Sequence, residues 1–167
     1  MAFSYSFKWL PLLLAAASLI TIASADQALI NSICAKARNH ALCYQVLNSV
    51  SADRGGLGQI STNVALGKAQ NSLNLAKNLA KKASDPRTKE QYKTCLEVYG
   101  DALDNLKDTK TSFGKKDFGT ANIRASAAYT DVDTCSDEGT NIAPELKAAN
   151  QENEDYIDIV LAVSNVN

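Results

Sequence analysis

Residues 95–135 read CLEVYGDALDNLKDTKTSFGKKDFGTANIRASAAYTDVDTC, and this stretch decides the fold. Its two cysteines, Cys95 and Cys135, are centred on position 115, next to Gly114. Because a glycine suits the residue just past a helix end, we expect the chain to turn at Gly114-Lys115. Two antiparallel helices meet at equal distances from the turn that joins them. The stretch therefore predicts two neighbouring antiparallel helices linked by a Cys95–Cys135 disulfide.

Apolar residues recur every three or four positions within this stretch and on both sides of it, which places them on one face of each of four helices. Asp85-Pro86 separates the first helix from the second. Asp117 caps the third, and Pro144 marks the start of the fourth. The four sets are Leu66, Ala69, Leu73, Ala76, Ala80 and Ala83 (a helix over about 57–83), then Tyr92, Leu96, Tyr99, Leu103 and Leu106, then Ala121, Ala125, Ala128, Val132 and Cys135, and last Leu146, Ala149, Tyr156, Val160 and Val163.

Each of these helices must bury its apolar face, and the connections between them are short. The fold class is therefore expected to be all-α, an up-down-up-down four-helix bundle over residues 57–165. A four-helix bundle could also hold an apolar ligand beside its alanine-rich third helix. A signalling ligand of cytokine type is a further class, although short loops do not suit the long crossovers of such bundles.

The other two cysteines predict a short helical hairpin over residues 26–52, before the bundle. Cys34 and Cys43 flank Arg38-Asn39 at nearly equal distances, as expected where two short helices fold back on each other. Four cysteines allow three disulfide connectivities, and the two symmetric spacings favour Cys34–Cys43 with Cys95–Cys135.

The segment Arg54-Gly55-Gly56-Leu57-Gly58 is interpreted as a hinge that joins the hairpin to the bundle. Zinc binding is the alternative use of the cysteines. The chain offers only one histidine, His40, and no Cys-x-x-Cys pair to support it.

The first 25 residues have the pattern of a secretory signal peptide. Lys8 precedes an apolar run that starts at Trp9, and Ala23-Ser24-Ala25 supplies the small residues of a cleavage site. Cleavage there would leave Asp26 as the first residue. The alternative is a membrane anchor, but the run is short for a span of about 20 residues. We expect a secreted protein with no membrane segment in its mature form, and a monomer is favoured.

Charge and composition argue against two broad functions. The chain has 17 basic and 18 acidic side chains, whereas nucleic-acid binding relies on Lys and Arg that neutralise phosphates. The chain has no Gly-x-Ser-x-Gly or His-Glu-x-x-His motif of the kind that hydrolases use. Its one histidine, His40, lies at the predicted hairpin tip beside a disulfide. Oxidised cysteines cannot act as thiolate nucleophiles. We therefore expect a binding protein and not an enzyme, with no cofactor and no metal.

Several segments of the chain occur together, and in this order, in one family. They are Ile33-Cys34-Ala35-Lys36-Ala37-Arg38-Asn39 with Leu42-Cys43, Ser84-Asp85-Pro86-Arg87, Tyr92-Lys93-Thr94-Cys95, Ala121-Asn122-Ile123-Arg124-Ala125-Ser126-Ala127-Ala128, Thr134-Cys135, and Asp158-Ile159-Val160-Leu161 with Ser164-Asn165. In this combination the chain resembles the plant invertase and pectin methylesterase inhibitor family over essentially its whole expected mature length. The resemblance implies an apoplast or cell-wall protein with a helical hairpin and a four-helix bundle. Such a protein binds a cell-wall enzyme non-covalently, one to one, and blocks its substrate cleft.

The loop Gly114-Lys115-Lys116-Asp117-Phe118 bears on which enzyme is the partner. Family members that inhibit invertase commonly carry Pro-Lys-Phe there, and pectin methylesterase inhibitors tend to carry Gly-Asp-Tyr or Gly-Asp-Phe. This chain lacks the proline and has Asp117 before Phe118. Pollen-type relatives named for invertase have a similar Lys-Asp-aromatic loop. The resemblance therefore favours pectin methylesterase (pectinesterase), with a cell-wall or vacuolar acid invertase as the alternative.

Four acidic residues of the second bundle helix lie at i, i+4, i+7 and i+11, so they form one row beside its apolar face. They are Glu97, Asp101, Asp104 and Asp108, and we call this row the acidic stripe. A rigid row of carboxylates would complement the polar groups of a cleft that accepts a polyuronide. Alternatively, the stripe is only a solvated helix face.

The resemblance also implies which residues touch the partner. They are Glu97, Asp101, Asp104 and Thr134, with Asn122 as a weaker candidate. The alternative for Thr134 is a hydroxyl that bonds a backbone carbonyl one turn back in its own helix.

Overall fold

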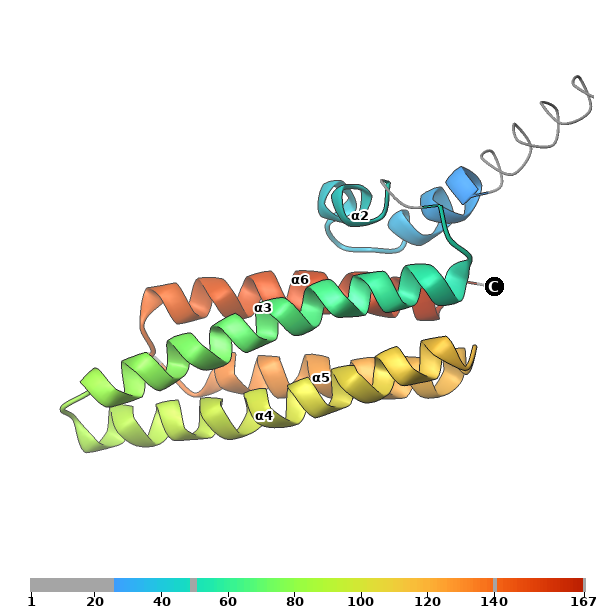
Figure 1. The fold of residues 1–167 in the computed structure, drawn as a ribbon. Helices are drawn as coiled ribbons and strands as arrows, with labels where there is room; N and C mark the ends of the chain where they lie inside the picture. Colours follow the sequence, from blue (N-terminus) through green and yellow to red (C-terminus); the bar gives the residue numbers. More distant parts are fainter. Residues whose placement is uncertain (1–25, 49–50, 140, 167) are drawn as a thin grey trace, which may run out of the picture.

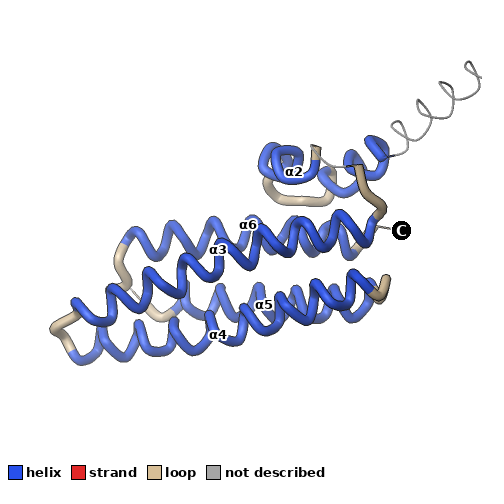
Figure 2. The backbone as a smooth tube through the Cα atoms, viewed as in Figure 1, coloured by secondary structure: helices blue, strands red, loops and turns tan. Residues whose placement is uncertain are grey.

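The structure is a computed structural model that describes residues 26–48, 51–139 and 141–166. All of its regular elements in these ranges are helices, as Figure 2 shows. The expected signal peptide, residues 1–25, lies outside the described residues. The elements are a helix over 26–34, α2 (His40–Leu47), α3 (Arg54–Lys82), α4 (Pro86–Gly114), α5 (Phe118–Asp137) and α6 (Pro144–Ser164).

The helices α3, α4, α5 and α6 form a closed four-helix bundle (Figure 1). Each one packs against the helix before and after it, and α6 returns to pack against α3. The hairpin that contains α2 lies on α3 and α6, on the opposite side of the bundle from α4. The all-α fold, with a bundle preceded by a hairpin, is confirmed. No helix in the described part of the chain is long and apolar enough to cross a membrane.

The predicted apolar faces form most of the core. All five predicted core residues of α5, from Ala121 to Cys135, are fully buried. Elsewhere the prediction is partly wrong, because Leu66 and Ala80 of α3, its C-cap residue Ala83 and Leu96 of α4 are only half-buried. In α6, Ala149 and Tyr156 are also half-buried. Asn150 and Asn153 occupy the buried positions, at 0% and 1% exposure. Both amides form hydrogen bonds in the core. The Asn150 amide and the Tyr99 hydroxyl are hydrogen-bonded at 2.6 Å, and Asn153 Nδ2 donates to Ser72 Oγ at 2.7 Å, whereas Asn153 Oδ1 has no hydrogen-bond partner among the described residues.

The expected hinge at Arg54–Gly58 is wrong, because these residues form the first turns of α3. Asp53 caps the helix by accepting a hydrogen bond from the Gly56 N–H at 2.9 Å. Gly58 serves packing rather than flexibility. A Cβ atom at Gly58 would lie 2.2 Å from Cδ1 of Phe113, so only a glycine lets this ring lie against α3.

The turn between α4 and α5 lies where the sequence predicts it, but Gly114 is not the residue past the helix end. It is the last residue of α4, and the positive φ, 58°, belongs to Lys116. The Lys116 N–H donates to Phe113 O at 3.0 Å and the Asp117 N–H to Ser112 O at 2.9 Å. These bonds satisfy carbonyls at the end of α4 and hold Lys116 in the left-handed conformation.

Both predicted disulfides are present. The Cα atoms of Cys34 and Cys43 are 5.4 Å apart, and those of Cys95 and Cys135 are 4.7 Å apart. Because the four sulfur atoms are paired in these two disulfides, the cysteines cannot supply thiolates to a zinc ion. The described residues contain no group of three or more His, Cys, Asp or Glu that could hold a metal.

Candidate partner-binding surface

Side-chain caps and the disulfide fix how α4 and α5 lie against each other. Asp85 accepts a hydrogen bond from the Thr88 N–H at 2.8 Å, which starts α4 and lowers the pKa of Asp85. Asp117 does the same for α5 through the Thr120 N–H at 3.0 Å, and its pKa is also lowered. The Cys95–Cys135 bond then sets the register of the two antiparallel helices.

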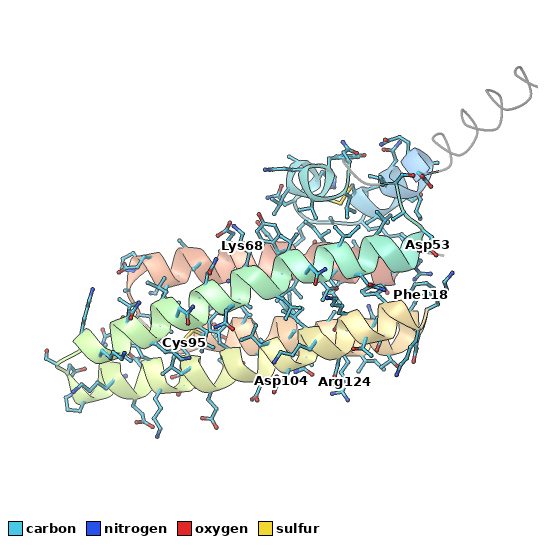
Figure 3. All side chains as sticks on the ribbon, in the orientation of Figure 1. Asp53, Lys68, Cys95, Asp104, Phe118 and Arg124 are labelled. Atoms are coloured by element: carbon cyan, nitrogen blue, oxygen red, sulfur yellow. A yellow bond between two sulfur atoms is a disulfide. The ribbon has the colours of Figure 1, made fainter. Side chains whose placement is uncertain are left out.

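The acidic stripe, Glu97, Asp101, Asp104 and Asp108, is exposed along its whole length on α4. The Asp104 carboxylate is 2.7 Å from Lys107 Nζ within the same helix. The Asp108 carboxylate is 3.7 Å from Arg124 Nε of α5. Figure 3 shows Asp104 and Arg124 projecting from the same edge of the bundle. The stripe therefore borders α5.

Asp131 of α5 belongs to this surface, although the sequence reasoning did not select it. Its carboxylate accepts a hydrogen bond from Asn105 Nδ2 of α4 at 3.0 Å. Burial raises the pKa of Asp131, the hydrogen bond from Asn105 opposes that shift, and the negative charge of Asp101 raises the pKa further. The Cys95–Cys135 register could have identified it, because Asp131 precedes Cys135 by four residues and Asp101 follows Cys95 by six, which puts the two within about one helical turn of each other.

Thr134 is exposed on α5, close to the level of Glu97 on α4. Thr134 directly precedes Cys135 and Glu97 follows Cys95 by two residues, so the disulfide places them at similar heights. The Thr134 hydroxyl donates to the Thr130 carbonyl at 2.8 Å, which is the intrahelical bond given above as the alternative. Glu97, Asp101, Asp104 and Thr134 are thus all exposed, on two helices that pack against each other.

Asn122 lies apart from these residues, on the side of α5 that faces α6. Its Nδ2 donates to Ser164 Oγ at 2.8 Å and its side chain is half-buried. The structure therefore gives Asn122 a contact between α5 and α6, and does not bring it next to the acidic stripe.

The loop between α4 and α5 is held against the start of α3. Lys116 Nζ is 3.0 Å from Asp53 Oδ2, and the Arg54 guanidinium lies 3.8 Å from the centroid of the Phe118 ring. Arg54 also donates from Nε to the Val163 carbonyl at 2.9 Å, which adds the end of α6 to the same cluster. Asp53 and Phe118 lie at the same end of the bundle in Figure 3. The side chains of Lys116 and Phe118 thus hold the loop against the bundle.

The side chains on this surface are suited to binding a partner molecule. The surface presents fixed carboxylates from α4 beside the hydroxyl-bearing and neutral side chains of α5. His40 is exposed at the start of α2, in the hairpin, and the four cysteines are oxidised.

Comparison with known proteins gives a consistent result. Residues 28–163 match the family model described as plant invertase/pectin methylesterase inhibitor. The chain is 41% identical over 149 residues to a pectinesterase inhibitor from Actinidia deliciosa, covering 85% of this chain and 80% of that protein. It is 30% identical over 125 residues to a Platanus orientalis protein named “Putative invertase inhibitor”, covering 72% of this chain and 74% of that protein. A crystal structure of a mutant form of an Arabidopsis pectin methylesterase inhibitor aligns with a TM-score of 0.74 at 25% identity, covering 82% of this chain and 95% of that one.

Proposed function

The chain belongs to the plant invertase/pectin methylesterase inhibitor family, and on that premise we propose that it inhibits a pectin methylesterase. Proteins of this family are inhibitors and not enzymes. The inhibitor binds non-covalently, one to one, and covers the substrate cleft with the face formed by α4 and α5. The observation that carries the proposal is the exposed acidic stripe beside α5, in a chain 41% identical to a pectinesterase inhibitor.

The stripe suits a cleft that accepts a polyuronide. Such a cleft must offer hydrogen-bond donors or cations to the carboxyl groups of its substrate, and charge-assisted hydrogen bonds of this kind are strong. A row of carboxylates on a rigid helix can engage the same groups without carrying a bond that the enzyme cleaves. Glu97, Asp101, Asp104 and Thr134 are the proposed contacts. Asn122 is a weaker one, because its amide already bonds Ser164.

An acid invertase is the second candidate target, and the Platanus relative is the observation that favours it. Inhibition of that enzyme through the α4–α5 loop would need the loop to project into a sugar-sized pocket. Phe118 is half-buried beneath Arg54, and Lys116 is paired with Asp53. These contacts support a role for the helix faces rather than the loop.

We also place the protein outside the cell, in the apoplast or cell wall. The pattern of residues 1–25 is that of a signal peptide. The two disulfides support the same location, since such bonds form and persist in oxidising compartments.

The proposed function is tested by residual enzyme activity. The full chain is expressed through a secretory pathway, purified, and added in increasing amounts to a plant pectin methylesterase and, separately, to an acid invertase. We expect the methylesterase activity to fall to zero near one equivalent and the invertase activity to stay unchanged. Loss of invertase activity alone would assign the protein to the other target.

A further inference from the structure

Ile123 of α5 is the one large hydrophobic side chain that is exposed among the residues the structure describes, at 68% exposure. A single exposed hydrophobic residue is ordinary on a soluble protein and carries no meaning alone. Its neighbours decide whether it belongs to a binding surface. Ala127, Thr130 and Thr134 follow it at i+4, i+7 and i+11, so these four residues form one row along α5, here called the neutral row. Thr130 and Thr134 are exposed, and Ala127 is half-buried.

The four residues of the neutral row carry no charge. Arg124 and Asp131, beside the row, contact α4, whereas the exposed Asp133 and Asp137 border its C-terminal end. Arg124 pairs with Asp108, and Asp131 accepts a hydrogen bond from Asn105. The row extends over about 16 Å, because 11 residues of helix rise about 1.5 Å each. It therefore runs parallel to the acidic stripe as an uncharged strip of similar length.

The two threonines of the neutral row need no new hydrogen-bond partner. The Thr130 hydroxyl donates to the Ser126 carbonyl at 3.1 Å, and the Thr134 hydroxyl donates to the Thr130 carbonyl at 2.8 Å. Covering a polar group is costly when it leaves a hydrogen bond unmade. Because both hydroxyls donate within the helix, a partner can cover this row at little cost in desolvation.

An uncharged centre bordered by charged groups is the usual arrangement of a protein–protein contact. A few buried anchors, surrounded by residues that exclude water, give most of the binding energy of such a contact. The neutral row and the acidic stripe together have this arrangement. A polyuronide has the same two features, since its carboxyl groups lie beside the C–H faces of its sugar rings.

We propose that Ile123 is the apolar anchor of the surface that binds the pectin methylesterase cleft. The partner surface is an apolar or aromatic patch that accepts Ile123, flanked by donors that face the carboxylates of α4. The proposal rests on the proposed function and adds to it a residue that the family resemblance did not select.

The test is the inhibition constant of the Ile123→Ala variant of the full secreted chain against a pectin methylesterase. We expect it to rise at least tenfold with an unchanged melting temperature, because a side chain this exposed adds little to the fold. Ile123→Leu keeps an apolar side chain and is expected to stay within about threefold of the starting protein. Asn63→Ala, at an exposed position on α3, is the matched control and is expected to have no effect.

Three outcomes would overturn the proposal. An Ile123→Ala inhibition constant within twofold of that of an active starting protein rejects the anchor and leaves the proposed function intact. An equal loss in Ile123→Ala and Asn63→Ala shows that the effect is not local, and also rejects it. A starting protein that inhibits no pectin methylesterase removes both the proposed function and the anchor.

Discussion

The side-chain Nδ2 of Asn105 in α4 donates a hydrogen bond to Oδ2 of Asp131 in α5, at a distance of 3.0 Å. This bond crosses the seam between the two helices that carry the proposed partner contacts. It holds a half-buried carboxylate beside Asp101, whose charge raises the pKa of Asp131 in addition to the effect of burial.

Asp131 is expected to make stability depend on pH. Its pKa is higher in the folded chain than in the unfolded chain, so its ionisation penalises the folded state. The penalty is absent below the unfolded pKa of about 3.8 and develops as pH rises through the folded value. Asp131→Asn should therefore melt at a higher temperature than the starting protein at pH 7, and the difference should shrink as pH falls toward 3.8. A constant difference at all pH values would show that the charge is not the cause.

The two disulfides should differ in how much they stabilise the fold. Chain entropy gives about 4 kcal/mol for the loop closed by Cys95–Cys135 and about 2.7 kcal/mol for that closed by Cys34–Cys43. Replacing Cys95 and Cys135 by alanine should therefore lower the free energy of unfolding more than the same change at Cys34 and Cys43. Chemical denaturation of the two double variants measures the difference. The reverse order would mean that the hairpin, and not the bundle, limits stability.

Arg38 is expected to hold the hairpin on the bundle. Its guanidinium lies 5.3 Å from the centroid of the Tyr129 ring and within 3.6–3.8 Å of the carboxylates of Glu154, Asp155 and Asp158. Arg38→Ala should lower the free energy of unfolding by about 1 kcal/mol, since the pairs are partly exposed. Lys81→Ala, at an exposed position of α3, is the control for thermal melting. Equal melting temperatures in the two variants would rule out this role.

The α4–α5 loop separates the two candidate targets. We expect the double variant Lys116→Ala, Phe118→Ala to lose less inhibition of pectin methylesterase than a variant of the acidic stripe, because the loop lies beside the contact and not in it. Its melting temperature must be measured too, since Phe118 packs against Phe113 with ring centroids 6.2 Å apart. A folded double variant that no longer inhibits invertase would favour invertase, provided that the starting protein never affected methylesterase.

The fold follows from the sequence wherever spacing alone determines it. The symmetric spacing of Cys95 and Cys135 about position 115 sets two antiparallel helices, and the apolar repeats set the bundle. The pattern fails for Asn150 and Asn153, because a search for apolar repeats passes over polar residues that find partners in the core. It fails at Gly58 for a related reason, since a glycine needed for a ring contact looks the same as one needed for a hinge.

The candidate site is only partly readable from the sequence. Helical spacing is enough to put Glu97, Asp101 and Asp104 on one exposed row. Asp131 requires the register between two helices, which the pattern within one helix does not fix. Ile123 lies opposite the apolar face predicted for α5, so the pattern is enough to place it outward, but nothing in the pattern marks it as a contact residue.

The inhibition constant of the triple variant Glu97→Gln, Asp101→Asn, Asp104→Asn against a pectin methylesterase tests most directly whether the α4–α5 face binds the enzyme. These side chains are exposed and contribute little to the core, so the variant should keep its circular dichroism and melting temperature. We expect inhibition to weaken by more than about 1.4 kcal/mol, roughly tenfold. Changing the exposed residues Lys77, Lys81 and Lys82 of α3 to glutamine is the matched control and should do less. An unchanged inhibition constant in a folded acidic variant would contradict the proposal and assign the stripe to solvent.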